Sequence, residues 1–227
     1  MDVRAIQAAL CAARYQVSVD GDLGPQTYSA LFAFVGRSQV TQMTAALGAA
    51  ADKWLPPAQI TTSLRLKHAL AQWAVETGGF KRLEEDLDYS AQRLTQVWPS
   101  RYPTIAAATP YAGHPIALAN KTYGGRFGNT KPNDGWTYRG RGPTQLTFRD
   151  NYAEAARLTG LDLLGDPDAV AEADTGLRVA CAYWTARGIN AAADRNDITA
   201  VRKAVNGGSI GLDEAKRYFA RASLIIT

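Results

Sequence analysis

Two glutamates, nine residues apart, have the residue type and the spacing of a general acid and a general base. Glu76 ends an apolar helical pattern beside Trp73, and such surroundings raise the pKa of a carboxyl group, as a general acid requires. Glu85 lies in a polar, acidic run, where ionisation is easier. A continuous helix would separate the two by roughly 13 Å, but Gly78–Gly79 predicts a break in it. A loop folded back at this point could bring the carboxyl groups to about 6.5–9.5 Å, the separation found in inverting glycoside hydrolysis.

The segment Asp134–Thr147 contains the side chains that a sugar-binding cleft uses. The rings of Trp136 and Tyr138 could cover the faces of pyranose units, and the glycines would let the backbone approach them. For these two rings, cleft lining and core packing are equally good interpretations. Arg139 and Arg141 are better explained as partners of local carboxylates than as ligands of a substrate.

Other catalytic classes lack the residues they need. With two histidines, two cysteines and neither a CxxC nor an HExxH motif, a zinc site would have to be assembled from scattered ligands. Gly207–Gly211 matches GxSxG, but no strand precedes it and no histidine follows it. Gly140–Gln145 lacks the third glycine of a dinucleotide loop. We therefore predict no metal and no organic cofactor, and we expect Cys11 and Cys181 to be reduced, buried thiols.

The elements that must position these residues are expected to be helices. No stretch alternates as a strand would, and residues 99–143 hold six of the ten prolines, which predicts a long functional loop system there. We therefore predict a mainly α protein. Apolar residues recur at helical spacing in Val3–Ala13, Thr27–Phe34, Thr61–Glu76, Ser90–Val97, Asn151–Thr159, Asp174–Arg187, Asp197–Val205 and Leu212–Ala222.

Length and composition indicate a folded, mildly basic protein. The chain has 227 residues, of which 46% are hydrophobic and 20% charged, and its net charge is +4. No apolar run reaches the ~18 residues of a membrane span, and the N-terminus lacks the layout of a secretory signal. We therefore expect a chain that is made and kept in a cytoplasm, without membrane insertion. Residues 76–88 form an acidic segment and residues 113–149 a basic one, and the charge of the basic segment suits an anionic cell wall better than nucleic acid.

The N-terminal region carries a turn with a specific pattern. The run Val19–Thr27, together with Gln7 and Leu10 upstream, resembles the peptidoglycan-binding domain type 1 motif. The resemblance implies a small helical wall-binding module over residues 1–40. That family usually adds a third helix, for which residues 36–45 are a weak candidate, so we expect a truncated module.

The rest of the chain resembles glycoside hydrolase family 19, the chitinase-like group. Within that group, the run Leu83–Ala91 and the short spacing between the two glutamates resemble the phage endolysin branch. The resemblance implies a lysozyme-like, mainly α catalytic domain over residues 41–227, with a cleft between two lobes. The motifs that carry it occur in the family's order and are Glu76–Phe80, Tyr138–Thr147 with Asn151–Tyr152, and Asn206–Gly208.

The resemblance also implies a role for each matching residue. Glu76 corresponds to the general acid, Glu85 to the base and Thr147 to the residue that helps to hold the attacking water. Glu84 is the neighbouring competitor of Glu85. The candidate substrate-binding residues are Gln145, Asn151 and Asn206, which fall where family members hydrogen-bond sugar, together with Trp136 and Tyr138.

One position departs from the family's pattern. Endolysin relatives usually carry an arginine shortly after the Asn-Gly-Gly loop, and the corresponding position here is Ala215, followed by Lys216 and Arg217. Either one of these two cations replaces the arginine, or the environment of the general acid differs from the family's.

Taken with the resemblance, these residues predict an endolysin that hydrolyses the glycan strand of bacterial peptidoglycan with inversion and so lyses the host cell. Its partner would be peptidoglycan, and it would act as a monomer. It would accumulate in the host cytoplasm and reach the wall in the periplasm through a separate pore protein. The alternatives are a chitinase, a non-catalytic wall-binding protein and, with the same chemistry, a delivered antibacterial toxin.

Overall fold

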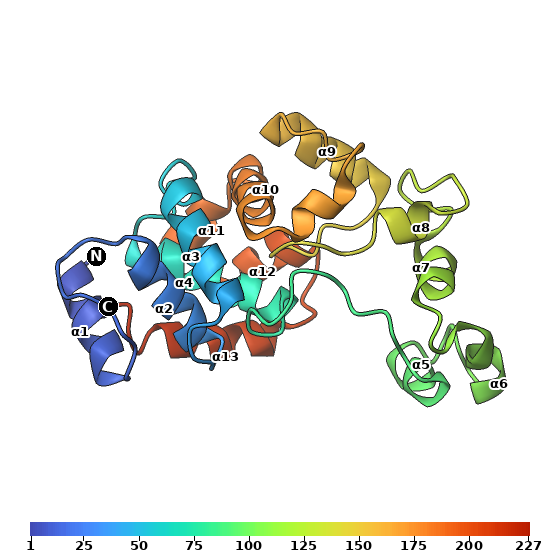
Figure 1. Cartoon of the computed structure of the whole chain (residues 1–227), viewed down its shortest axis with the longest axis horizontal. Helices are drawn as coiled ribbons and strands as arrows, with labels where there is room; N and C mark the ends of the chain where they lie inside the picture. Colours follow the sequence, from blue (N-terminus) through green and yellow to red (C-terminus); the bar gives the residue numbers. More distant parts are fainter.

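The computed structural model describes residues 1–227 and is built almost entirely from helices (Figure 1). Its only β-type pairings are two isolated bridges, so the prediction of a mainly α protein is confirmed. The α-helices are α1 (Val3–Ala12), α2 (Pro25–Val35), α3 (Gln42–Trp54), α4 (Ser63–Glu76), α5 (Ala91–Val97), α6 (Ile105–Ala108), α7 (Pro115–Tyr123), α8 (Asp134–Thr137), α9 (Arg149–Thr159), α10 (Ala173–Ala186), α11 (Ile189–Asp194), α12 (Ile198–Asn206) and α13 (Leu212–Ala222), and the 3₁₀ helices are η1 (Thr109–Tyr111) and η2 (Pro167–Ala171).

The larger lobe packs around α4. Thr62 caps the N-terminus of this helix by accepting a hydrogen bond from the Arg65 backbone N–H, and the helix is buried along its C-terminal half. Trp73 is fully buried and its ring meets that of Trp184 edge to face, with 6.1 Å between the centroids. One continuous hydrophobic cluster joins residues of α1–α4 with residues of α10–α13. Glu76 therefore stands at the end of a helix that the core holds rigidly.

The smaller lobe contains α5–α8 and has a core of its own. Leu94, Tyr102 and Leu118 are fully buried in this lobe, and partly buried aromatic residues surround them. Figure 1 shows the lobe on the right, joined to the rest by the extended segment that follows α4. A third small cluster, which includes Tyr152 and Val170, packs α9 and η2 against α10. The segment that carries Glu85 thus runs from the larger lobe to the smaller one.

The N-terminal motif has a structural explanation. Gln7 is buried on α1, and its side-chain nitrogen donates hydrogen bonds to Asp20 Oδ1 (2.8 Å), to the Asp22 carbonyl (2.9 Å) and to Thr27 Oγ1 (3.1 Å). Its side-chain oxygen accepts a hydrogen bond from the Gly21 backbone N–H at 2.8 Å. The motif residues therefore hold the loop between α1 and α2 in place.

The proposed boundary at residue 40 stays a prediction, but the hydrophobic core does not divide there. Ile6, Leu10 and Phe32 belong to the same buried cluster as Trp73 and Ile226. The helix that packs against α2 is α3, which begins at Gln42, beyond the expected end of the module. Residues 1–40 thus share their core with the rest of the larger lobe.

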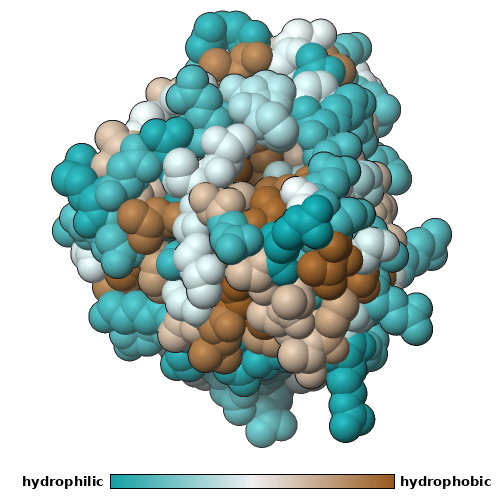
Figure 2. Space-filling model, turned by 90° about the vertical axis from the view of Figure 1, so that its left-hand side faces the viewer, coloured by the Kyte–Doolittle hydropathy of each residue, from teal (hydrophilic) through white to brown (hydrophobic).

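Figure 2 shows the end of the molecule where α1 and the two termini lie. Apolar residues form patches on this face between hydrophilic ones, as on most protein surfaces. None of the helices combines the length and the hydropathy that crossing a bilayer demands.

Several local expectations were wrong. Residues 99–143 are not only loops, because Pro115 starts the nine-residue helix α7, and α3 and α11 had no clear signal in the sequence. Cys11 is exposed, since α1 turns this position away from the core, whereas Cys181 is buried as expected. Burial raises the pKa of the Cys181 thiol to about 12, which keeps it protonated and unreactive.

Candidate active site in the cleft at the end of α4

Glu76 is the last residue of α4, and its carboxylate forms an ion pair with a buried arginine. Nη1 of Arg202, on α12, donates a hydrogen bond to Glu76 Oε1 at 2.6 Å. The side chain of Arg202 is 3% exposed and that of Glu76 is 16% exposed. Burial raises the pKa of Glu76, and the positive charge of Arg202 and its hydrogen bond oppose this rise. The carboxyl group is therefore largely buried, with one cation beside it.

Arg202 is itself held on two other sides. Its Nε donates to the Ile210 carbonyl at 2.7 Å, and its Nη1 also donates to Gln72 Oε1 at 3.2 Å. Gln72 lies on α4, one turn before Glu76. The guanidinium thus links α4, α12 and the loop before α13, and it fixes the position of the Glu76 carboxylate.

Arg202 also resolves the departure at Ala215. Ala215 is fully buried where α13 packs against α4, and neither of the two following cations pairs with Glu76. Lys216 lies 3.7 Å from Asp213, and Arg217 lines a separate pocket with Glu214. The partner of Glu76 therefore comes from α12. The sequence indicates this partner only indirectly, because Arg202 lies on the same helix face as the apolar residues Val201 and Val205.

Glu85 is positioned by short β-type pairings between three segments. Its backbone N–H donates to the Gly140 carbonyl at 2.9 Å, and the Gly142 N–H donates to the Leu83 carbonyl at 2.7 Å. Arg141 and Leu146 exchange backbone hydrogen bonds of 3.1 and 2.8 Å. Residues 83–85 therefore lie beside 140–142, which in turn lie beside Leu146 and so bring Thr147 close to Glu85.

The environment of Glu85 differs from the polar, solvated one that the sequence suggested. Burial raises the pKa of this carboxyl group as well. The Tyr123 hydroxyl donates a hydrogen bond to Glu85 Oε1 at 2.5 Å, and the Gly140 N–H donates one to Oε2 at 3.4 Å; both favour the ionised form. Tyr123, on α7, was missed in the sequence because it lies inside the segment expected to be loop. Burial and the neighbouring Glu85 carboxylate raise the pKa of Tyr123, so its hydroxyl keeps its proton.

Three candidate residues converge on Gly140. A Cβ at Gly140 would lie 2.8 Å from Gln145 Oε1, 3.2 Å from Glu85 Oε2 and 3.3 Å from Thr147 Oγ1. A larger residue at this position would displace the Gln145 side chain and crowd the Glu85 and Thr147 oxygens. The Thr147 hydroxyl donates to the Gln145 carbonyl at 2.9 Å, so its lone pairs point elsewhere and can accept a hydrogen bond.

Glu76, Gln145 and Thr147 line one open cleft of about 410 Å³. Asn151 and Asn206 line it too, as does Tyr183. The Asn151 amide nitrogen donates to the Thr147 carbonyl at 2.7 Å, while the Asn206 side chain makes no hydrogen bond within the protein. The structure thus brings the predicted acid, the threonine predicted to hold the water and all three predicted sugar-binding amides to one surface.

The two predicted aromatic ligands behave differently. Tyr138 is 7% exposed and packs against the Tyr152 ring, with 5.3 Å between the centroids, so its assignment to the substrate surface was wrong. Its ring fills the small core beneath α9 instead. Trp136 is half-buried, and the Arg139 guanidinium lies over its ring at 3.8 Å, which covers one of its faces.

Glu84 and the two arginines of the loop pair with each other or with local groups. Arg139 Nε donates to Glu84 Oε1 at 2.5 Å, and Arg141 forms an ion pair with Asp168 and a 2.8 Å hydrogen bond to the Tyr152 hydroxyl. The structural interpretation of Arg139 and Arg141 is confirmed. Glu84 is engaged with Arg139, which leaves Glu85 as the carboxylate beside Thr147.

Polar side chains elsewhere do not form a metal centre. No group of three or more His, Cys, Asp or Glu side chains gathers where it could hold an ion. The chemistry that this cleft offers is proton transfer between carboxyl groups and a substrate.

Comparison with known sequences identifies the family. The family model described as Chitinase class I matches residues 101–203. A glycosyl hydrolase family 19 domain-containing protein of Haemophilus influenzae is 38% identical over 153 residues, which are 66% of this chain and 74% of that protein. Chitinase 6 of Oryza sativa subsp. japonica is 39% identical over 71 residues, 31% of this chain and 26% of that protein.

Comparison with solved structures agrees in fold. Chitinase C of Streptomyces griseus superposes with a TM-score of 0.58 at 20% sequence identity, covering 87% of this chain and 75% of that one. The family 19, class IV chitinase of Zea mays superposes with a TM-score of 0.52 at 17% identity, covering 89% and 92%. The predicted lysozyme-like helical fold is thereby confirmed. The chain belongs to glycoside hydrolase family 19 and is a chitinase-like glycosidase.

Proposed function

We propose that this glycosidase is an endolysin, which hydrolyses the glycan strand of bacterial peptidoglycan by single displacement with inversion. Glu76 is the general acid, Glu85 the general base, and Thr147 holds the attacking water. The observation that carries the proposal is that Thr147, which lines one cleft with Glu76, also meets Glu85 beside Gly140.

The proton transfers follow from the surroundings of the two carboxyl groups. Burial raises the pKa of Glu76, which favours the protonated form that gives its proton to the leaving glycosidic oxygen. The carboxylate left behind is stabilised by Arg202 at 2.6 Å. Arg202 thus supports the charge that appears on Glu76 as the bond breaks.

The base works on the other side of the sugar. Glu85, once ionised, accepts a proton from a water that also hydrogen-bonds to the Thr147 hydroxyl, and the water attacks the anomeric carbon. Hydrogen bonds from Tyr123 and Gly140 keep the Glu85 carboxylate oriented toward Thr147. No covalent intermediate forms, because the nucleophile is water.

Product analysis of purified sacculi tests this function. We expect new reducing ends on N-acetylmuramic acid and a product whose anomeric configuration is inverted. Intact glycan with cut peptide stems would contradict a glycosidase acting on this polymer, and retained configuration would contradict the direct role of water.

A chitinase is the second candidate, since the relatives with named activities are chitinases. Two features favour peptidoglycan: the resemblance of Val19–Thr27 to a wall-binding motif, and Arg187 in the cleft, a cation without a carboxylate partner. Parallel turnover of chitin oligomers and sacculi separates the two candidates. Faster turnover of chitin oligomers would favour the chitinase.

The pH dependence of the rate is expected to respond to Tyr123. The rate should fall at acid pH as Glu85 gains a proton and at alkaline pH as Glu76 loses one. Tyr123→Phe removes a hydrogen bond that lowers the pKa of Glu85, so that pKa rises and the acid limb moves to higher pH. The alkaline limb should stay in place. A pH–rate profile measures both limbs.

The matched control is Tyr111→Phe, because Tyr111 lies in the same lobe and its hydroxyl makes no hydrogen bond within the protein. Its profile should coincide with that of the unmodified enzyme. An acid limb that stays in place or moves to lower pH in Tyr123→Phe would assign it to a group other than Glu85.

In this proposal, residues 1–40 attach the enzyme to the wall, and the enzyme acts as a monomer in the periplasm after a separate pore protein releases it from the host cytoplasm. Binding of sacculi by Glu76→Gln, with and without substitutions on the face shown in Figure 2, tests the attachment. A neighbouring pore gene would support a phage lysis enzyme, and a neighbouring secretion apparatus would support a delivered toxin.

A further inference from the structure

A groove branches from the catalytic cleft and runs between α9 and α10. The cleft shares Asn151, Tyr183 and Arg187 with a side pocket of about 270 Å³. That pocket shares Leu158 and Ala186 with the next one, of about 330 Å³. The three pockets therefore adjoin one another, and the branch begins beside the cleft that Glu76 lines.

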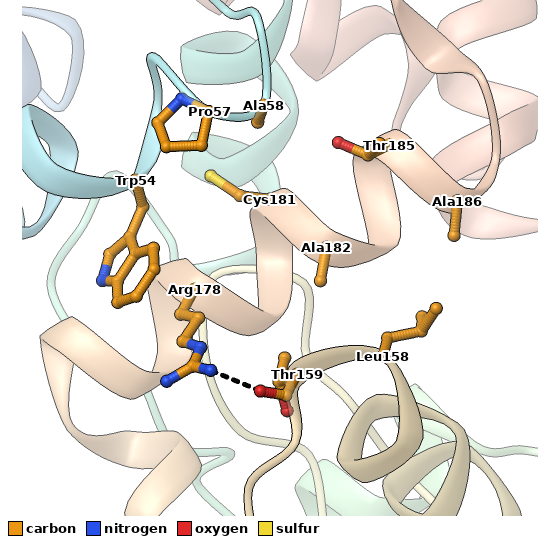
Figure 3. A pocket seen from close by; sticks show the side chains of 10 residues that line it. All are labelled: Trp54, Pro57, Ala58, Leu158, Thr159, Arg178, Cys181, Ala182, Thr185 and Ala186. Carbon is orange, nitrogen blue, oxygen red and sulfur yellow. Dashed lines mark hydrogen bonds between the residues drawn. The ribbon is translucent and has the colours of Figure 1, made fainter.

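The walls of the branch are largely apolar. Six of the nine residues around the first pocket and six of the ten around the second are hydrophobic. Figure 3 shows the far pocket, where Ala182, Ala186 and Cys181 of α10 face Pro57 and Leu158 across the opening. A sugar needs many hydrogen-bonding partners and would find few of them here. A segment with methyl side chains fits such walls better.

Two arginines that form no ion pair, Arg178 and Arg187, mark the ends of the branch. Arg187 stands where the branch leaves the cleft, with its guanidinium 4.4 Å from the centre of the Tyr183 ring. Arg178 stands in the far pocket, 4.9 Å from the Trp54 ring, and it donates to the Thr159 carbonyl. Among the residues that line the two pockets, only Glu154 has a carboxylate, and it is paired with Arg157 at 2.7 Å. The Asp174 carboxylate lies beside the far pocket, where it accepts a hydrogen bond from Trp54 Nε1 at 2.8 Å. An occupant with carboxylates would complement these two charges.

We propose that this groove binds the peptide stem that branches from the muramic acid units of peptidoglycan. Such a stem combines small alanine side chains with free carboxylates. It branches from the side of the sugar ring, and the groove likewise branches from the side of the cleft. The inference rests on the proposed function and deepens it, because stem binding would make peptidoglycan, and not chitin, the preferred polymer.

The test compares glycan strands with stems and strands from which an amidase has removed them. We expect the unmodified enzyme to show a kcat/KM about tenfold higher on the stem-bearing strands. Ala186→Trp fills the groove at the point where its two pockets meet, so it should abolish that preference and leave the rate on stem-free strands unchanged. The control, Ala220→Trp, introduces the same ring on an exposed position of α13, away from the groove, and should behave as the unmodified enzyme.

A binding experiment keeps this inference separate from the proposed function. A soluble alanine–glutamate–diamino acid tripeptide is titrated into the isotope-labelled protein, and saturable shifts of α9 and α10 resonances are expected. Arg178→Gln should weaken this binding about threefold to tenfold, since one charge-assisted contact is lost. If neither glycan form is cleaved but the tripeptide binds, the proposed function is wrong and the assignment of the groove to the peptide stem is still supported. The proposal would be overturned if the tripeptide showed no saturable binding, or if Ala186→Trp lowered kcat/KM equally on stem-bearing and stem-free strands.

Discussion

Glu76→Gln is expected to lower the rate of glycan cleavage by about 10²–10⁴-fold, the usual contribution of a general acid. Glutamine has nearly the same shape and can still accept the hydrogen bond from Arg202, but it has no acidic proton to give to the leaving oxygen. The fold should therefore survive. The rate is measured as reducing ends released from sacculi, and the melting temperature and circular dichroism report the fold.

The control for Glu76→Gln is Glu172→Gln, which makes the same change on an exposed residue whose side chain makes no capping hydrogen bond. It should retain full activity. A Glu76→Gln enzyme with substantial residual lysis would show that another group protonates the leaving oxygen.

Arg202→Met is expected to cost about 3–5 kcal/mol of unfolding free energy, as the loss of one partner from a buried ion pair does. The arginine is 3% exposed, and its removal leaves the Glu76 carboxylate, Gln72 Oε1 and the Ile210 carbonyl without their common donor. Methionine keeps much of the volume, so the effect reports lost polar contacts. Chemical denaturation measures it.

The pH dependence separates the ion pair from packing. The folded-state pKa of Glu76 is raised, so its contribution to stability is full at low pH and is lost as pH rises through that pKa. Without Arg202 this loss grows, and the deficit of Arg202→Met should be larger at about pH 8 than at about pH 4. The double variant Glu76→Gln/Arg202→Met has no buried charge at this site and should be more stable than Arg202→Met near neutral pH. An equal deficit at both pH values would point to packing alone.

Local patterns in the sequence predicted most of the helices and most of the cleft. The cap at Thr62, the apolar spacing that follows and the glycines after Glu76 define α4 and its end, and Leu212–Ala222 was located to the residue. Residues 99–143 were harder, because prolines and glycines there do not forbid helices that start at a proline, as α7 does. The third helix, α3, is rich in alanine, so its apolar periodicity is weak.

The candidate site was likewise predictable from the sequence only in part. Glu76, Glu85 and Thr147 each lie in a short sequence motif, so their residue types and order can be recognised from the sequence alone. The sequence alone did not reveal that burial raises the pKa of Glu85, because its immediate neighbours are polar and the residues that contact it, Tyr123 and Gly140, are distant in the sequence. Tyr138 illustrates the reverse case, since a ring in a polar loop turns into the core.

What the sequence by itself determined is therefore the helical class, the family and the identity of the candidate acid, base and water-holding residue. Only the tertiary structure decided which groups tune them: Arg202 reaches Glu76 across 126 residues of chain, and Tyr123 reaches Glu85 across 38. The physical reason is that helix spacing and turns depend on neighbours in the sequence, whereas burial, ion pairing and a branching groove depend on how distant helices pack.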